Sequence, residues 1–324
     1  MGDPAGIGPE IIAKAWAARR NRALAPFVAV GDVRAVERVW DGPVRLVTDL
    51  ARVAAVFEEA LPVLQIEDAG EIVPGQPDIE GARCALHALE VAAGLARSGA
   101  ARALVTGPVS KAQLYAIGFS HPGQTEFVAE RCGIAGANAV MMLAGPSLRV
   151  VPITTHVPVA AVSDLLSTEL ILAKARVTAR GLRRDFGIEH PRLAFAGLNP
   201  HAGEGGAIGG EEIAVIVPAV ERLREEGIDA RGPFAADTLF HPRARADYDV
   251  ALCPTHDQAL IPIKTLHFDE GVNMTLGLPI VRTSPDHGTA FGIAGQDQAH
   301  PGAMIAAIAM AADAAGQRAA HACA

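Results

Sequence analysis

The sequence is poor in the residues that mark several common classes of protein. Aromatic residues make up only 4% of the 324 residues, although half of the chain is hydrophobic. A core must therefore be built mainly from Ala, Val, Leu and Ile, which suits parallel strands covered by helices. The four cysteines are far apart and form no Cys-x-x-Cys pair, so we expect free thiols in a cytoplasmic protein rather than a disulfide framework. These are Cys84, Cys132, Cys253 and Cys323.

Three further patterns are missing, and each one argues against a function. The chain carries a formal charge of −8 without a block of Lys or Arg, which argues against nucleic-acid binding because phosphates need a concentrated basic face. It shows no signal peptide and no apolar run of membrane-spanning length, so we expect no membrane partner. No Gly-x-Gly-x-x-Gly follows a strand, so the usual dinucleotide-binding fingerprint is missing.

Helix and strand patterns alternate almost throughout the chain, which predicts an α/β fold with parallel strands. There is no repeat, low-complexity tract or linker, so we treat residues 1–324 as one catalytic chain without a clear boundary. We expect helices over residues 9–20, 78–98, 109–117, 124–132, 167–186, 210–227 and 301–316, with a short helix after His256. We expect strands over residues 27–31, 44–47, 62–66, 101–106, 138–143, 148–154, 192–198, 249–253 and 279–283, with a hairpin through Gly145-Pro146.

Three histidines share one context that is typical of a metal site. His156, His201 and His256 each follow a short apolar run closed by Pro, Thr, Asn or Gly. Each run predicts a buried strand, and ligands of open α/β sheets bind beyond the carboxyl ends of strands. Three neutral imidazoles can hold a divalent metal and leave a position open for substrate. The alternative is that these are three unrelated loop histidines. The remaining histidines have no such context.

A second group of polar side chains is suited to an anion. Lys264, Asn273 and Arg282 lie within one stretch, and Arg282 stands in an apolar, strand-like run. An arginine offers a two-pronged contact to phosphate or carboxylate, although a structural salt bridge would also explain it. Gln124 and Thr125, at the start of a predicted helix, add donors for the same anion, unless they merely cap the helix.

A glycine-rich segment and several acidic residues complete the candidates. The segment 203–210 leads into a helix start, where backbone N–H groups favour the phosphate of a nucleotide or substrate. We select Asn199, Gly203 and Gly205 as candidate cofactor contacts. Asp257, next to His256, is expected to orient that imidazole. Cys253 precedes His256 by three residues, but a buried thiol in a strand is the better interpretation.

Taken together, the motifs resemble one family, the 4-hydroxythreonine-4-phosphate dehydrogenases of pyridoxal phosphate biosynthesis. The resemblance covers nearly the whole chain. Its motifs are Gly2-Asp-Pro-Ala-Gly-Ile-Gly-Pro-Glu10, Val105-Thr-Gly-Pro-Val-Ser-Lys111, Gly123-Gln-Thr-Glu126, Thr155-His-Val-Pro158, Gly197-Leu-Asn-Pro-His-Ala-Gly-Glu204, Gly232-Pro-Phe-Ala-Ala-Asp-Thr-Leu-Phe240, His256-Asp-Gln258, Gly271-Val-Asn-Met-Thr-Leu-Gly-Leu-Pro279 and Arg282-Thr-Ser-Pro-Asp-His-Gly-Thr-Ala290.

The resemblance implies a fold like that of isocitrate and isopropylmalate dehydrogenases, with two interleaved α/β subdomains and a central cleft. It implies a homodimer whose active site takes residues from both subunits, with NAD or NADP and one divalent metal (Zn, Mg or Co) as cofactors. The family's metal ligands correspond to His156, His201 and His256. Its substrate-binding residues correspond to Thr125, Lys264, Asn273 and Arg282, with Gln124 at a further such position.

The implied reaction is the oxidation of 4-phosphohydroxy-L-threonine by NAD(P) to a 3-keto acid. That acid then decarboxylates to 3-amino-2-oxopropyl phosphate. The metal would bind the substrate hydroxyl and lower its pKa, and a base would remove the proton. Lys264, Asp237 and Asp257 are the candidates for the base, and the sequence does not choose among them.

The chain departs from the family pattern in two places. The family often has His where this chain has Gln124, and an amide donates a hydrogen bond but carries no charge. The family also has a strand before its Gly-Asp-Pro-Ala-Gly loop. Met1 here stands directly before that loop, so we expect that a first strand of about 5–6 residues is missing before Gly2.

Three alternatives stay open. Gln124 is compatible with the same chemistry on a related substrate, either a phosphorylated sugar acid or an aromatic cis-dihydrodiol carboxylate. A three-histidine metallohydrolase fits the missing nucleotide fingerprint but leaves Lys264, Asn273 and Arg282 unexplained. A metal-binding scaffold without catalysis is the last alternative. Binding of a nicotinamide cofactor separates the dehydrogenases from the other two.

Overall fold

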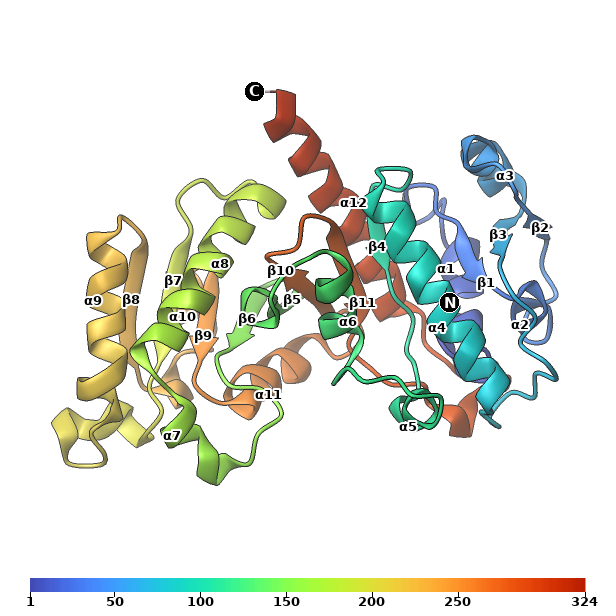
Figure 1. Cartoon of the computed structure of the whole chain (residues 1–324). Helices are drawn as coiled ribbons and strands as arrows, with labels where there is room; N and C mark the ends of the chain where they lie inside the picture. Colours follow the sequence, from blue (N-terminus) through green and yellow to red (C-terminus); the bar gives the residue numbers. More distant parts are fainter. Residues whose placement is uncertain (324) are drawn as a thin grey trace. The chain divides into compact units, whose positions relative to one another are not determined.

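The computed structural model describes residues 1–323 and divides the chain into two compact units (Figure 1). Unit 1 comprises residues 1–133 and 279–312, and unit 2 comprises residues 134–278 and those from Asp313 onward. The larger segment of unit 2 is therefore inserted into unit 1 in the sequence. Among the residues that the structure describes, no helix is both long and apolar enough to cross a bilayer.

The first half of unit 1 is a three-stranded parallel sheet with the strand order β1-β3-β2. Its strands are β1 (Ala29–Gly31), β2 (Val44–Leu46) and β3 (Leu61–Gln65). Its helices are α1 (Gly8–Ala17), α2 (Val33–Glu37) and α3 (Val53–Glu59), with a 3-10 turn at Leu50–Arg52. Ile11, Val36, Leu61 and Val63 are buried together in its core, with Trp16 and Phe57 as its aromatic members. This agrees with the expectation of a core built mainly from aliphatic side chains.

The second half of unit 1 is built on the parallel pair β4 (Ala103–Val105) and β11 (Val281–Pro285). The predicted helix over residues 78–98 is confirmed as α4 (Ile79–Arg97). The Asp78 carboxylate caps the start of this helix by accepting a hydrogen bond from the Gly81 N–H. After β4 come α5 (Lys111–Ala116) and α6 (Gln124–Arg131). A 3-10 turn at Phe291–Ile293 precedes α12 (Gly302–Cys323), which begins in unit 1 and ends in unit 2.

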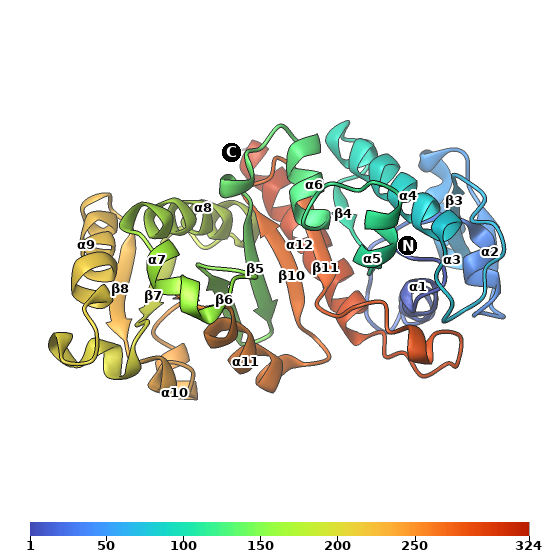
Figure 2. The same ribbon diagram turned by 60° about the horizontal axis from the view of Figure 1, so that its bottom comes forward.

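Unit 2 is built on six strands in the order β10-β5-β6-β9-β7-β8 (Figure 2). The strands β6, β9, β7 and β8 run parallel, whereas β5 is antiparallel to both β6 and β10. Their bounds are β5 (Val140–Gly145), β6 (Leu148–Pro152), β7 (Arg192–Ala196), β8 (Asp229–Phe234), β9 (Val250–Cys253) and β10 (Val272–Leu276).

The helices of unit 2 cover this sheet, and α9 lies along β8 in both ribbon views. The helices are α7 (Val162–Leu165), α8 (Thr168–Phe186), α9 (Val217–Glu225), α10 (Pro242–Arg245) and α11 (His256–His267). The helix α8 begins after a Ser167 cap and ends at Gly187 in the left-handed conformation, as glycine permits. Shorter turns lie at Gly136–Asn138, Val159–Ala161, Pro200–Gly206, Glu212–Ile216 and Ala236–Thr238.

The α/β fold class is confirmed, and most strand pairs are parallel as predicted, with β5 antiparallel to β6 and β10. The predicted hairpin through Gly145-Pro146 is present, and a tight hairpin forces its two strands to be antiparallel. The prediction missed β8, which contains Gly232-Pro233, and β10, which is bounded by Gly271 and Gly277. The helix expected over residues 210–227 opens with a π-helical turn at Glu212–Ile216.

The cysteines behave as the sequence predicts where the structure describes them. Cys84, Cys132 and Cys253 are free thiols. Cys253 is completely buried within β9, and burial raises the pKa of its thiol far above the usual range. A thiol that resists ionisation is a poor metal ligand, so Cys253 is a packing residue. The side chain of Cys323 lies outside the described part of the chain.

Candidate active site

The three selected histidines follow three neighbouring strands of unit 2, which confirms their predicted strand-end context. His156 lies four residues after β6, His256 three residues after β9, and His201 five residues after β7. The strand β9 pairs in parallel with both β6 and β7, so the carboxyl ends of all three strands meet at one edge of the sheet. This is the edge at which open α/β sheets bind ligands.

Two of these histidines are close neighbours. The ring centroids of His156 and His256 are 5.7 Å apart. His256 is the first residue of α11, which Thr255 and Gln258 cap reciprocally. The His256 Nδ1 atom lies 2.8 Å from Oδ1 of Asp257. An imidazole that donates Nδ1–H to a carboxylate presents Nε2 as its ligating nitrogen, so Asp257 is placed to orient His256 as expected.

The backbone that carries two of the histidines is strained. His156 and His201 both have a φ of +53°. His201 also opens a run of five residues, 201–205, in the left-handed helical region, and three of the five are not glycine. Left-handed backbone is unfavourable for residues with a Cβ atom and persists where the surrounding structure enforces it, often at functional sites. We call residues 201–205 the left-handed turn.

The donor chemistry of this edge fits a divalent metal, but a single chain brings only part of a ligand set together. Neutral imidazoles are good ligands for zinc and cobalt, and a carboxylate already orients one of them. Within residues 1–323, however, no three His, Cys, Asp or Glu side chains are arranged to hold a metal ion. His201 therefore does not join His156 and His256 in a three-ligand group within one chain. The metal site stays a prediction.

Three further candidates belong to unit 2. Asp237 is exposed and lies three residues after β8, at the same sheet edge as the histidines. Lys264 is half-buried on α11, seven residues after Asp257, so the two lie on one face of that helix. Asn273 lies in β10, and its buried Oδ1 atom accepts no hydrogen bond from the described part of the chain. A buried acceptor of this kind calls for a donor, which a bound ligand can supply.

Arg282 is the most unusual charged residue of unit 1. It lies in β11 and is only 3% exposed. Its Nη2 donates to Thr106 Oγ1 over 2.8 Å and its Nη1 donates to Thr125 Oγ1 over 3.2 Å. Burial lowers the pKa of Arg282 to about 10, and the nearby charge of Glu126 acts in the opposite direction. The guanidinium is still a cation at neutral pH, held in a fixed pose by two neutral hydroxyl groups.

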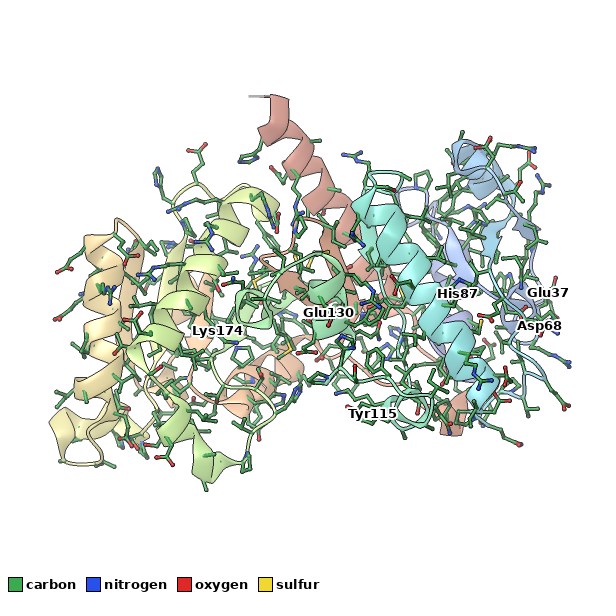
Figure 3. The ribbon with its side chains drawn as sticks, in the orientation of Figure 1. Glu37, Asp68, His87, Tyr115, Glu130 and Lys174 are labelled. Atoms are coloured by element: carbon green, nitrogen blue, oxygen red, sulfur yellow. The ribbon has the colours of Figure 1, made fainter. Side chains whose placement is uncertain are left out.

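The residues around this arginine build an environment for an anion. Thr125 is the second residue of α6, whose free N–H groups and helix dipole favour negative charge. Gln124 donates from Nε2 to the carbonyl oxygen of Gly107 over 3.1 Å, which joins the start of α6 to the loop after β4. His121 Nε2 lies 2.8 Å from Oε2 of Glu130, so the segment before α6 is attached to the helix itself. Figure 3 labels Glu130 on α6.

Of the candidate cofactor contacts Asn199, Gly203 and Gly205, the first two contact other parts of unit 2. The Asn199 side-chain amide donates to Glu211 and Glu212, and its backbone N–H donates to Glu212. Gly203 is buried, and a Cβ atom there would lie 2.6 Å from Oε2 of Glu212. Gly205 is exposed and has open space beside it. The cofactor-binding role of these residues stays a prediction, and the contacts show a role in shaping the left-handed turn.

Comparison with known proteins identifies the family. A sequence model described as "Pyridoxal phosphate biosynthetic protein PdxA" matches residues 22–311. The chain belongs to this family. A relative named 4-hydroxythreonine-4-phosphate dehydrogenase, from Zymomonas mobilis, is 58% identical, over 99% of this chain and 96% of its own length.

Solved structures share the fold of this PdxA family member. The crystal structure of 4-hydroxythreonine-4-phosphate dehydrogenase from Klebsiella pneumoniae matches with a TM-score of 0.86 and 36% identity, covering 97% of this chain and 98% of that one. A terephthalate 1,2-cis-dihydrodiol dehydrogenase from Burkholderia xenovorans matches with a TM-score of 0.64 and 30% identity, covering 97% and 96%. The fold is thus shared by dehydrogenases that are named for different substrates.

Two residues that the sequence analysis overlooked contribute to these sites. Thr106 is buried and holds the Arg282 guanidinium, and its position just after an apolar strand was the available signal. Glu212 is buried beneath the left-handed turn and binds Asn199. Nothing in the sequence distinguishes Glu212 from its neighbour Glu211, because both precede the same helix.

Proposed function

We propose that this PdxA family member oxidises 4-phosphohydroxy-L-threonine with NAD or NADP. The 3-keto acid formed would then lose CO2 to give 3-amino-2-oxopropyl phosphate. The observation that supports a phosphorylated substrate best is the buried Arg282 guanidinium beside the N-terminus of α6. A buried fork of N–H donors next to a helix start suits a phosphate group, which is tetrahedral and offers several acceptor oxygens.

The substrate-binding roles follow from side-chain chemistry. Arg282 and Thr125 would hold the phosphate, and Gln124 would add a neutral donor if it turns away from Gly107. Asn273 supplies an amide whose buried oxygen accepts no hydrogen bond within the described chain, so it can accept one from the substrate's ammonium or hydroxyl group. Lys264 adds a cation for the substrate carboxylate. Fixing the substrate by several such contacts contributes to rate through orientation.

The metal proposal assigns His156, His201 and His256 as ligands of one divalent ion, with Zn, Mg or Co as candidates. A bound divalent ion would act as a Lewis acid toward the oxygen of the reacting carbon. Asp257 would keep His256 in the ligating tautomer, given its 2.8 Å contact to Nδ1. The proton of the substrate hydroxyl would pass to Lys264, Asp237 or Asp257, and only a complex with substrate can decide among them.

We also propose that the enzyme is a homodimer that completes the ligand set with residues of a second copy. The incomplete set within one chain supports this view, as do apolar side chains that are exposed on the segments carrying His156 and His256. Val159, just after His156, is 82% exposed, and Ile261 and Phe268, on or next to α11, are 64% and 76% exposed. Large apolar side chains that are exposed in this way are typical of an interface.

The main alternative is the same chemistry on an unphosphorylated cyclic substrate. It is favoured by the likeness to the terephthalate 1,2-cis-dihydrodiol dehydrogenase, and by the neutral Gln124 in the proposed phosphate site. The two substrates would be compared under identical conditions by reduction of NAD+ or NADP+. We expect a far higher kcat/KM for 4-phosphohydroxy-L-threonine. A higher value for the cis-dihydrodiol carboxylate would reject the proposed substrate and keep the reaction class.

A further inference from the structure

The left-handed turn that carries His201 needs an internal support. His201, Ala202 and Glu204 adopt φ values of 53°, 51° and 44° without being glycine. Such a run is unfavourable for L-residues, and a short exposed loop would ordinarily relax to another conformation. Another group must therefore hold residues 201–205 in the left-handed conformation.

A buried carboxylate lies inside the loop. Glu212 is 2% exposed. Its Oε1 accepts the backbone N–H of Asn199 over 2.7 Å, and its Oε2 accepts the Asn199 side-chain amide over 2.9 Å. Asn199 stands two residues before His201, so both carboxylate oxygens act on the segment that leads into the turn.

The same carboxylate also packs against the glycines of the loop. A Cβ atom on Gly203 would lie 2.6 Å from Glu212 Oε2, and one on Gly197 would lie 3.2 Å from Oε1. The chain therefore passes the carboxylate closely on both sides of His201, so a Cβ atom at either glycine would force a neighbouring group to shift. Glu212 also begins a π-helical turn, a distortion that is found mostly at functional sites.

Neighbouring contacts set the outer edges of the loop. Glu211 accepts hydrogen bonds from the Asn199 amide over 2.8 Å and from Ser163 Oγ over 2.7 Å. Gln258, from the capping box of α11, donates to the carbonyl oxygen of Gly197 over 2.9 Å. Asn199 and Gly197 are thus also held by Glu211 and Gln258, whereas the Glu212 carboxylate lies inside the loop.

We infer that Glu212 is a positioning residue, which holds the left-handed turn so that the His201 imidazole is fixed for metal binding. It acts through Asn199 and Gly203 and does not itself bind metal or substrate. This inference rests on the proposed metal-binding role of His201. It predicts that the negative charge and the two-acceptor geometry of Glu212 matter for metal affinity, in addition to any effect on folding.

The test measures Zn2+ binding by the purified full chain, with a competing chromophoric chelator, for wild type and for Glu212→Gln. The amide directs an N–H2 group at a neighbour that is itself a donor, so one of the two contacts to Asn199 is lost. We expect Zn2+ affinity to fall by about 10- to 100-fold, as for other groups that orient metal ligands. Saturating Zn2+ should restore most of kcat, which a general folding defect would not allow.

Two controls separate positioning from stability. Asp185→Asn removes another buried carboxylate of unit 2, whose partners Arg184 and Arg318 lie outside the turn. It should lower thermal stability but leave Zn2+ affinity within about twofold of wild type, because no contact that orients a proposed metal ligand is lost. Ala202→Gly relieves the left-handed backbone and should recover part of the lost affinity in the Glu212→Gln background.

The outcomes are distinct. If wild type binds Zn2+ and His201→Ala does not, but Glu212→Gln binds as tightly as wild type, the inference about Glu212 is wrong. If His201→Ala binds Zn2+ as wild type does, the proposed metal site itself fails. Should Glu212→Gln not fold, Asn199→Ala replaces it, because it removes one of the two contacts and keeps the carboxylate. Wild-type affinity in that variant would equally overturn the inference.

Discussion

Replacing Arg282 by methionine should separate phosphate recognition from the chemistry of oxidation. Arg282 is 3% exposed and donates to Thr106 and Thr125. Methionine has a similar length and no charge, so Arg282→Met removes the guanidinium fork without opening a large cavity. Replacing a buried charged group by an apolar one of similar volume is often tolerated by the fold.

The size of the effect follows from the two N–H groups that would face the phosphate. A hydrogen bond to a charged group contributes about 1.5–3 kcal/mol, so losing two costs about 3–6 kcal/mol of binding. Every 1.4 kcal/mol corresponds to about tenfold, so kcat/KM should fall by about a hundred- to twenty-thousand-fold. Most of this loss should appear in KM if the phosphate is bound equally in the ground state and the transition state.

The assay follows reduction of the nicotinamide cofactor with two substrates, 4-phosphohydroxy-L-threonine and unphosphorylated 4-hydroxy-L-threonine. The slow reaction of the unphosphorylated substrate should change by less than about threefold in Arg282→Met, since it never uses the phosphate contacts. Thr125→Val keeps the guanidinium but removes one of its two hydroxyl partners, so its loss with the phosphorylated substrate should be intermediate. Circular dichroism and thermal unfolding would verify that both variants fold.

An equal loss for both substrates in Arg282→Met would refute this reasoning, because the guanidinium would then act on something other than the phosphate. An unchanged KM for the phosphorylated substrate would refute it as well. Either result would leave the family membership intact and move the phosphate-binding role elsewhere.

Three other predictions concern the metal, the pH dependence of stability and the interface. Asp257→Asn should weaken Zn2+ binding by about 10- to 100-fold, as read by chelator competition, since His256 would lose its anionic partner; no change would remove Asp257 from the site. Burial raises the pKa of Asp3 from 3.8 to about 6, so ionisation of this carboxyl group destabilises the fold. Asp3→Asn should therefore match wild type in unfolding free energy below pH 3.8 and exceed it by about 2–3 kcal/mol above pH 6. A constant difference across this range would contradict the assignment. Val159→Asp, at a side chain that is 82% exposed, should shift the protein toward monomer in sedimentation, and an unchanged dimer would place the interface elsewhere.

The strand-end histidines show what can be predicted from local sequence. Each of the runs before His156, His201 and His256 is short and apolar, and such runs bounded by turn residues become buried strands. Their parallel pairing then brings the carboxyl ends to one edge. That part of the site needs only local patterns and a general rule of α/β sheets.

The support of these histidines could not be predicted in the same way. Asn199 and Glu212 are thirteen residues apart, without a helical or strand period that would bring them together. The left-handed backbone at Ala202 is imposed by the surrounding chain, since nothing in an alanine favours it. The strand β10 was missed because five residues between two glycines give too short a pattern to predict a strand. Asn273 was therefore grouped with Lys264 and Arg282 without being assigned to a strand.

The central claim is tested most directly by metal-dependent turnover of the proposed substrate. Protein stripped with EDTA would be mixed with 4-phosphohydroxy-L-threonine and NAD+ or NADP+, before and after addition of Zn2+, Mg2+ or Co2+, with reduction of the cofactor and release of CO2 followed together. We predict no reaction in the stripped protein, and restored reduction with an equal yield of CO2 once the metal is added. Full activity without metal, or a folded and metal-loaded protein that reduces no cofactor, would contradict the account.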